Sequence, residues 1–116
     1  MSGETHIEVG GGLESDLKAF AQAWRRAEAG DITEERVLAF ESWEALSKVL
    51  TGERYRLLRH VHARPARSVN ALAQDLRRQY RRVHEDVRIL EEAGLIDRSH
   101  GDVRATADRL RADVIF

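Results

Sequence analysis

The chain has 116 residues, a formal net charge of −1, 42% hydrophobic and 34% charged residues, and no cysteine. This length fits one domain that buries about 65% of its unfolded surface, and the lack of cysteine excludes disulfides, thiolate zinc sites and cysteine nucleophiles. No apolar run approaches the ~20 residues of a membrane span, and the amino end is polar rather than signal-like, so we expect a cytoplasmic protein without membrane contact.

The charge is divided unevenly along the chain. Residues 1–50 contain ten acidic and five basic residues, whereas residues 54–88 contain ten arginines and only three acidic residues. The first segment therefore has a net charge of −5 and the second a net charge of +7. This asymmetry indicates a nucleic-acid-binding face joined to an acidic region that meets a different partner. The alternative interpretation is a random clustering of solvated charges.

The first elements are expected to be a strand and an amphipathic helix. The segment from Thr5 to Val9 alternates polar and apolar residues and precedes three glycines, which is typical of a strand followed by a turn. Within residues 13–29, apolar side chains recur at helical spacing and Gly30 follows as a stop. This stripe is too apolar for an isolated surface helix, so it must pack on the domain or on a second copy. We predict a dimer or partner interface at Leu13, Leu17, Phe20 and Trp24.

The middle of the chain is expected to contain a short strand and two helices. Residues 36–40 resemble a strand, and Ser42 starts a helix that carries Trp43, Leu46, Val49 and Leu50. Thr51 can cap the next helix, because its hydroxyl can accept hydrogen bonds from the amides of the following turn. Pro65 lacks the amide proton of a helix interior and closes the connection. The predicted buried side of this helix is Tyr55, Leu57, Leu58 and Val61.

Two further helices, a hairpin and a terminal strand complete the prediction. Ser68 caps a helix that would bury Val69, Leu72, Ala73 and Leu76. The helix from about 79 to 93 would bury Val83, Val87 and Leu90, and Gly94 ends it. Residues 95–106 resemble a hairpin with a turn at His100-Gly101. The tail RLRADVIF alternates like a strand that could pair with Thr5–Val9, within one chain or across a dimer.

Three helices followed by a hairpin are typical of a winged helix-turn-helix. We therefore predict a mainly α fold with a small β component, in which a winged helix-turn-helix carries an N-terminal strand-helix extension. The expected division is an extension at residues 1–50, for dimerisation or partner binding, and a DNA-binding domain at residues 51–116.

The helix from about 79 to 93 would read DNA. Because residues turn by about 100° along a helix, burial of Val83, Val87 and Leu90 points the opposite face outward. Its amino end would enter the major groove, where Arg81 and His84 are the best base readers and Tyr80 is a further candidate. The remaining arginines are expected to hold phosphates. The full predicted DNA-binding set is Arg77, Arg78, Tyr80, Arg81, Arg82, His84, Arg88, Arg98 and Arg104.

These side chains have other roles open to them. Arg81 with Glu85, and Arg82 with Asp86, are spaced four residues apart and could form solvated ion pairs on the helix surface. Tyr80 could instead cover the edge of the core. Since both carboxylates would repel phosphate, one of them is expected to orient an arginine or cap a neighbouring helix.

Four segments carry a resemblance to a known family: THIEV, FESWEALSKVLTGERYRLLRHV (residues 40–61), NALAQDLRRQYRRVHEDVRILEEAGLI (residues 70–96) and the terminal strand. In these segments the chain resembles the MarR-like winged helix-turn-helix regulators predicted in archaea and bacteria. It implies a transcriptional regulator that binds DNA, sometimes as an antitoxin encoded beside a small toxin. Three positions depart from the family pattern. This chain has Arg77 where the family has glycine, Gln79 where it has aspartate, and Gly52 where it has proline. Arginine in a left-handed turn costs on the order of 1 kcal/mol, and glutamine caps helices poorly.

We expect a homodimeric, sequence-specific regulator of transcription that binds double-stranded DNA in successive major grooves about 34 to 36 Å apart. The alternative is an antitoxin whose N-terminal region neutralises a toxin protein while the chain autoregulates its operon. No enzyme is expected, because no nucleophile with a positioned base, paired carboxylates or metal constellation is recognisable. His60 and His62 lie two residues apart, which places them on different faces of a helix, so no metal and no cofactor is predicted.

Overall fold

A computed structural model describes residues 3–10, 17, 21, 24, 25, 28 and 35–116. The chain divides into two compact units, one made of Met1–Leu46 with Asp108–Phe116 and the other of Ser47–Ala107. The predicted boundary after residue 50 lies close to the first division. The prediction that residues 51–116 form one domain is wrong for the last nine residues, because their strand pairs with the first strand of the chain.

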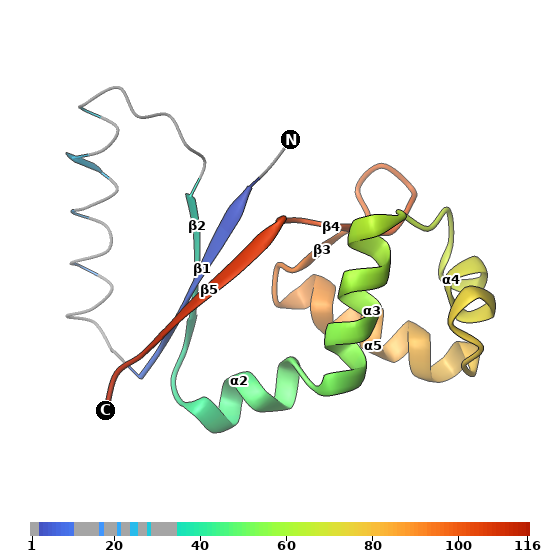
Figure 1. The fold of residues 1–116 in the computed structure, drawn as a ribbon, viewed down its shortest axis with the longest axis horizontal. Helices are drawn as coiled ribbons and strands as arrows, with labels where there is room; N and C mark the ends of the chain where they lie inside the picture. Colours follow the sequence, from blue (N-terminus) through green and yellow to red (C-terminus); the bar gives the residue numbers. More distant parts are fainter. Residues whose placement is uncertain (1–2, 11–16, 18–20, 22–23, 26–27, 29–34) are drawn as a thin grey trace. The chain divides into compact units, whose positions relative to one another are not determined.

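The first unit contains a three-stranded sheet in which all strands are parallel (Figure 1). Its order is β2 (Glu35–Phe40), β1 (Glu4–Val9) and β5 (Arg109–Val114), with β1 in the centre. The three predicted strands are thus confirmed, and the terminal strand pairs with the first one within the same chain. Thr5, Ile7 and Val9 point to one face of β1 and are buried, which follows from the alternation of side chains along a strand.

The opposite face of the sheet carries cross-strand contacts between polar and charged side chains of β1 and β5. His6 Nε2 lies 2.8 Å from Asp113 Oδ2, and Arg111 Nε lies 3.3 Å from Glu4 Oε1. Charged residues on this face and apolar residues on the other set the register, because a slip by one residue would exchange the two faces.

The predicted helix at residues 13–29 falls mostly outside the described residues, as do Leu13 and Phe20 of its predicted interface. Within it Leu17, Ala21, Trp24, Arg25 and Glu28 are helical. Leu17 and Trp24 are each 60% exposed, and the Trp24 indole donates a hydrogen bond to Glu28 Oε1 at 2.8 Å. Whether this stripe binds a second copy or another protein stays a prediction.

Serine and threonine caps begin the helices where the sequence predicts them. Ser42 Oγ accepts from the Ala45 amide at the start of α2 (Trp43–Val49), at 3.2 Å. Thr51 Oγ1 accepts from the Arg54 amide at 3.3 Å, at the start of α3 (Gly52–Ala63). Ser68 Oγ accepts from the Ala71 amide at 3.0 Å, at the start of α4 (Val69–Leu76). Each hydroxyl satisfies an amide that has no partner within its helix.

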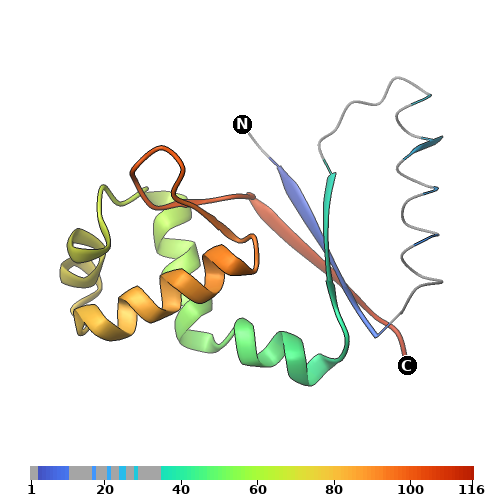
Figure 2. The same ribbon diagram turned by 180° about the vertical axis from the view of Figure 1, so that it is seen from behind.

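The second unit packs α3 and α4 with α5 (Tyr80–Glu92) and a short hairpin. Seen from behind, α5 crosses in front of α3 (Figure 2). The hairpin joins β3 (Ile96–Asp97) to β4 (Arg104–Ala105), and a bridge between Ala66 and Val103 ties it to the segment before α4. Its turn contains Gly101, whose φ of +88° confirms the predicted glycine turn. The most deeply buried apolar side chains of this unit are Leu57, Val61, Leu72, Val83, Val87, Leu90, Leu95 and Val103.

Two predictions about this core need correction. Tyr55 was expected on the buried side of α3, but it is 47% exposed, and the Arg59 guanidinium lies 5.8 Å from its ring centroid. At about 100° per residue, Tyr55 lies roughly 115° from the middle of the stripe formed by Leu57, Leu58 and Val61. Leu76, expected to face inward, is only half-buried at the end of α4. None of the helices in the described residues is long and apolar enough to cross a membrane.

We predict that Gly10→Ala destabilises the fold more than Gly101→Ala. Both glycines have positive φ values, +83° and +88°, so each substitution carries a backbone penalty of about 1 to 2 kcal/mol. At Gly10 a Cβ would also lie 2.7 Å from the Ile115 carbonyl oxygen, whereas at Gly101 it would meet nothing within 4 Å. Urea unfolding monitored by circular dichroism would measure both losses, and equal losses would show that the Ile115 contact is unimportant.

Candidate functional site

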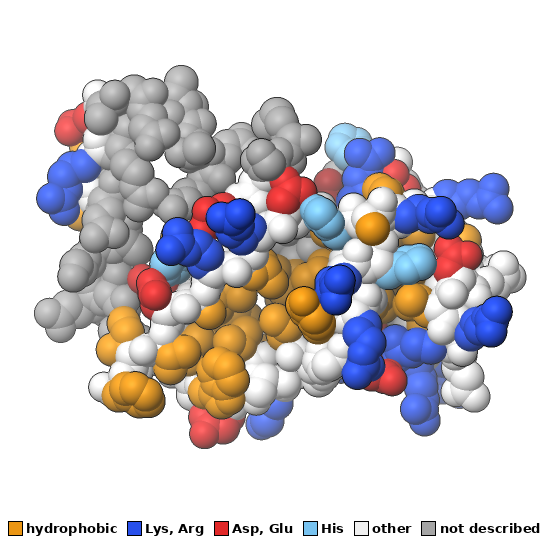
Figure 3. All heavy atoms as spheres, in the orientation of Figure 1, with side chains coloured by type: hydrophobic (Ala, Val, Ile, Leu, Met, Phe, Trp, Pro, Cys, Tyr) orange, Lys and Arg blue, Asp and Glu red, His pale blue; other side chains and the backbone are white. Residues whose placement is uncertain are grey.

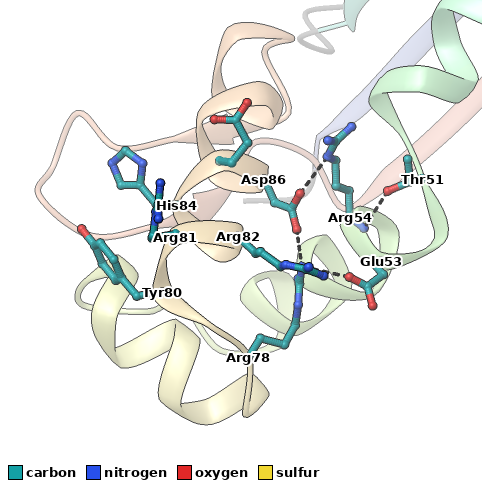
Figure 4. Close-up of a pocket in the computed structure, with 10 residues that line it drawn as sticks. Thr51, Glu53, Arg54, Arg78, Tyr80, Arg81, Arg82, His84 and Asp86 are labelled. Carbon is teal, nitrogen blue, oxygen red and sulfur yellow. Dashed lines mark hydrogen bonds and ion pairs between the residues drawn. The ribbon is translucent and has the colours of Figure 1, made fainter.

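An open hollow of about 710 Å³ lies between the starts of α3 and α5, within the second unit (Figure 4). Its walls contain four arginines and three carboxylates, together with a tyrosine, a histidine and a threonine. The lining residues are Thr51, Glu53, Arg54, Arg78, Tyr80, Arg81, Arg82, His84, Glu85 and Asp86.

Asp86 is the buried charge of this site. It sits on the same face of α5 as the core residues and is only 8% exposed. Its Oδ1 accepts from Arg54 Nε at 3.0 Å, and its Oδ2 accepts from Arg78 Nη2 at 2.7 Å. A buried carboxylate without partners would cost several kcal/mol, and two guanidinium groups offset that cost. The expectation that one of the two acidic residues orients an arginine is thus confirmed for Asp86.

The same network reaches the neighbouring helix ends. Arg78 Nη2 also lies 2.9 Å from Glu53 Oε2, in the first turn of α3. Arg54 Nη1 donates to the carbonyls of Lys48 at 2.6 Å and Val49 at 3.2 Å, at the end of α2. These carbonyls have no amide partner within α2, so the guanidinium completes their hydrogen bonding. Arg54 therefore connects α2, α3 and α5.

The turn before α5 places its first residues. Arg77 adopts the left-handed conformation, with φ 53° and ψ 45°, where the related pattern has glycine. Its amide donates to Gln74 O at 3.1 Å, and the Arg78 amide donates to Ala73 O at 3.0 Å, which closes the end of α4. Gln79 precedes α5 without a side-chain cap, so no side chain among the described residues accepts from the first amides of α5.

The exposed face of the α5 start carries the predicted base readers. Tyr80 is 49% exposed, and its ring centroid lies 5.7 Å from that of His84, which is also exposed. Arg81 and Arg82 are exposed, and neither forms an ion pair with any residue that the structure describes. In Figure 4 Tyr80, Arg81 and His84 project from the side of α5 away from Asp86. The outward orientation predicted for these side chains is confirmed.

The alternative ion pairs on α5 do not form in the predicted combinations. Asp86 pairs with Arg54 and Arg78 instead of Arg82. Glu85 pairs with Arg88 instead of Arg81, with Arg88 Nη2 2.7 Å from Glu85 Oε1. The hydrogen bond from Arg88 holds the pKa of the Glu85 carboxyl below its usual range. Arg88 also donates to Glu92 Oε1 at 2.7 Å, so this arginine is already bound by two carboxylates.

The structure brings only part of the predicted set together. Arg78, Tyr80, Arg81, Arg82 and His84 line the hollow. The predicted arginines that do not line it are Arg77 in the turn, Arg88 on α5, and Arg98 and Arg104 on the hairpin. The hairpin arginines also differ in their surroundings: Arg104 Nε donates to Asp102 at 2.8 Å, whereas Arg98 is half-buried.

Sequence reasoning missed the role of α3 in this site. Glu53 and Arg54 lie in the first turn of α3, but their pairing with Arg78 and Asp86 was not predicted from the sequence. Asp86 is 32 residues from Arg54, and no local pattern reveals a contact at that separation. Several basic side chains (blue) lie over α3 in Figure 3. The sequence shows the positive charge of this helix, but it does not show which carboxylates the arginines pair with. No group of acidic and histidine residues among those described could hold a metal ion.

We predict that Asp86→Asn lowers the free energy of unfolding by about 2 to 3 kcal/mol, because it leaves two largely buried guanidinium groups without a charge partner. Glu85→Gln removes a neighbouring carboxylate whose partner Arg88 is 47% exposed, so it should cause a much smaller loss. Chemical denaturation of both variants tests this difference, and similar losses would contradict the structural role of Asp86.

Comparison with known proteins gives one family relationship. Neither the curated proteins nor the solved structures include a match to the chain. The profile of the family described as HVO_A0114 matches residues 49–114, which covers more than half of the sequence and includes every residue of the hollow. The chain therefore belongs to the HVO_A0114 family.

Proposed function

We propose that residues 47–107 form a winged helix-turn-helix and that the protein is a homodimeric, sequence-specific DNA-binding regulator of transcription rather than an enzyme. The observation that carries the proposal is that Arg81 and Arg82, at the start of α5, are exposed and form no ion pair with any described residue. The order of α3, α4, α5 and a hairpin supports the fold, as do the three-residue turn between α4 and α5 and the bridge that ties the hairpin to the segment before α4. The resemblance to MarR-like regulators leads to the same proposal.

The start of α5 suits a role in the major groove. Its inner face is anchored by Val83 and Val87, both fully buried, and by Asp86. Because the helix is already anchored, binding to DNA does not have to order its backbone. Arg81 is proposed to read a guanine edge through its two donor groups, and His84 to contact the next base.

Phosphate contacts would use the remaining positive groups of this surface. Arg82 is exposed and unpaired in the described structure, so it can form an ion pair with a phosphate without breaking another one. The first amides of α5 lack a side-chain acceptor, and a helix amino terminus favours an anion at that position. A backbone phosphate would provide both the missing acceptor and the negative charge.

Two arginines receive different roles from those expected. Arg78 is only 20% exposed and is held by Asp86 and Glu53, so we propose that it positions α5 instead of contacting DNA. Arg88 would have to leave two carboxylates before it could bind phosphate. DNA contacts by Arg77, Arg98 and Arg104 stay predictions. The alternative of an antitoxin also stays a prediction, because the predicted helix of its N-terminal region is mostly outside the described residues.

We predict that Arg81→Ala relaxes sequence preference at one position of the bound site, whereas Arg82→Ala weakens binding to all sequences alike. A base contact discriminates by about 1 to 3 kcal/mol, which is roughly 5-fold to 150-fold in affinity, while a phosphate contact carries no sequence information. Binding of the full-length protein to a randomised duplex library, followed by sequencing of the bound fraction, measures both effects.

Arg36→Ala on β2 is the matched control, because it removes the same charge from an exposed position of the first unit. The wild-type protein should also lose affinity with salt at a log-log slope of about 0.9 per phosphate contact. Binding that is absent, independent of salt or equally weakened by all three variants would refute the proposed interface.

A further inference from the structure

The strand β5 leaves one edge of the sheet open. It pairs with β1 on its inner side, and none of the described residues pairs with its outer side. The Ile115 amide donates to Val9 O at 2.9 Å, so odd-numbered residues of β5 direct their backbone groups toward β1. Leu110, Ala112 and Val114 therefore direct their N–H and C=O groups outward, because these groups alternate sides along a strand. An open edge of this kind is a template for another strand.

The sequence of β5 is complementary to itself about Ala112. If two copies pair antiparallel with Ala112 opposite Ala112, then Leu110 lies opposite Val114 and Arg111 lies opposite Asp113. Apolar residues then face apolar residues on one side of the sheet. On the other side arginine faces aspartate, and the symmetry provides this ion pair twice. Opposite charges directly across an antiparallel pair are favourable, and like charges are unfavourable.

The charges select this register over its neighbours. Centring the pairing on Arg111 would place two arginines opposite each other, and centring it on Asp113 would place two aspartates opposite each other. The other edge strand, β2, offers no such arrangement, since Arg36 shares its face of the strand with Leu38 and Phe40 and with no acidic residue. Charge complementarity therefore points to β5 and to one register.

We propose that β5 is the dimerisation edge of this protein and that its occupant is β5 of a second copy. Two sheets of three strands would join into one sheet with the order β2-β1-β5-β5-β1-β2 around a two-fold axis at Ala112. Arg111 and Asp113 are 69% and 67% exposed despite their pairing with Glu4 and His6, so each has room for a second partner. This inference rests on the homodimer of the proposed function but not on DNA binding.

Charge reversal tests the proposed pairing. We expect Arg111→Asp and Asp113→Arg each to raise the dimer dissociation constant by roughly tenfold or more, because each replaces two attractive pairs by two repulsive ones. The double variant Arg111→Asp/Asp113→Arg should return to nearly the wild-type constant. It cannot restore the pairs with Glu4 and His6 inside one chain, so recovery would report the contact between copies. Sedimentation velocity of the full-length protein over a range of concentrations measures these constants.

A cysteine placed on the two-fold axis provides a second test, because the chain has no cysteine of its own. The Cα atoms of a hydrogen-bonded antiparallel pair are about 5.5 Å apart, within reach of a disulfide, so Ala112→Cys should form a linked dimer under oxidising conditions. Leu110→Cys is the matched control, since the two copies of residue 110 would lie roughly 13 Å apart along the strands.

The results of these experiments test the β5 interface separately from DNA binding. A protein that stays monomeric, a dimer insensitive to both single reversals, or equal crosslinking at residues 110 and 112 would overturn the β5 interface. If DNA is bound under those results, the DNA-binding role stands, and a monomeric protein would remove only the homodimer from the proposed function. A dimer linked through Ala112→Cys that binds no duplex DNA would overturn the proposed function and leave the interface in place.

Discussion

The Asp86 carboxylate between Arg54 and Arg78 is the interaction on which the second unit depends. A carboxylate that is 8% exposed must be paired, and its partners come from α3 and from the turn before α5. Each guanidinium also makes a second contact. Arg54 donates hydrogen bonds to the carbonyls at the end of α2, and Arg78 forms an ion pair with Glu53. One buried charge thereby orients three helix ends relative to α5, in addition to the apolar packing of Val83, Val87 and Leu90.

This pairing divides the basic residues into two groups. Residues 54–88 have a net charge of +7, but Arg54, Arg78 and Arg88 are bound by carboxylates within the second unit. The ten arginines of this segment therefore overstate the number of positive charges that are free to attract a polyanion. Arg81 is on the outer face of α5, away from Asp86, whereas Arg82 lies one turn before Asp86 on the same side of the helix. No ion pair in the described structure uses either of them. Arg82 is free because Asp86 pairs with Arg54 and Arg78, and Arg81 is free because Glu85 pairs with Arg88.

The first unit depends on a pairing between the two ends of the chain. β1 is the central strand of a parallel sheet, and β5 joins it from about one hundred residues away in the sequence. Parallel strands cannot be joined by a tight hairpin, so the second unit is inserted between the strands that complete the sheet. Division of the chain into an N-terminal extension and a C-terminal domain could not describe this arrangement. It also leaves β5 at an edge, where its self-complementary charges are exposed.

Local physics in the sequence determined the elements. Hydroxyl caps at Ser42, Thr51 and Ser68 start their helices because they satisfy amides of the following turn. Helical spacing identified the buried residues of α5, and glycines marked turns that require positive φ. These features involve residues within a few positions of each other, so they can be predicted from the sequence without knowledge of the fold. Tyr55 was misplaced because an apolar residue at a helix start can lie beside the buried stripe as easily as within it.

Contacts between distant residues were decided only by the tertiary structure. The sequence alone indicated that one of Glu85 and Asp86 should orient an arginine or cap a neighbouring helix, and that the last strand could pair with the first. Only the fold decided that Asp86 takes Arg54 and Arg78, and that β1 and β5 pair in parallel within one chain. The physical reason is that the charge of a side chain, or the alternation of polar and apolar residues along a strand, indicates only the kind of partner required. Which of several suitable partners, tens of residues away, comes within bonding distance depends on the fold.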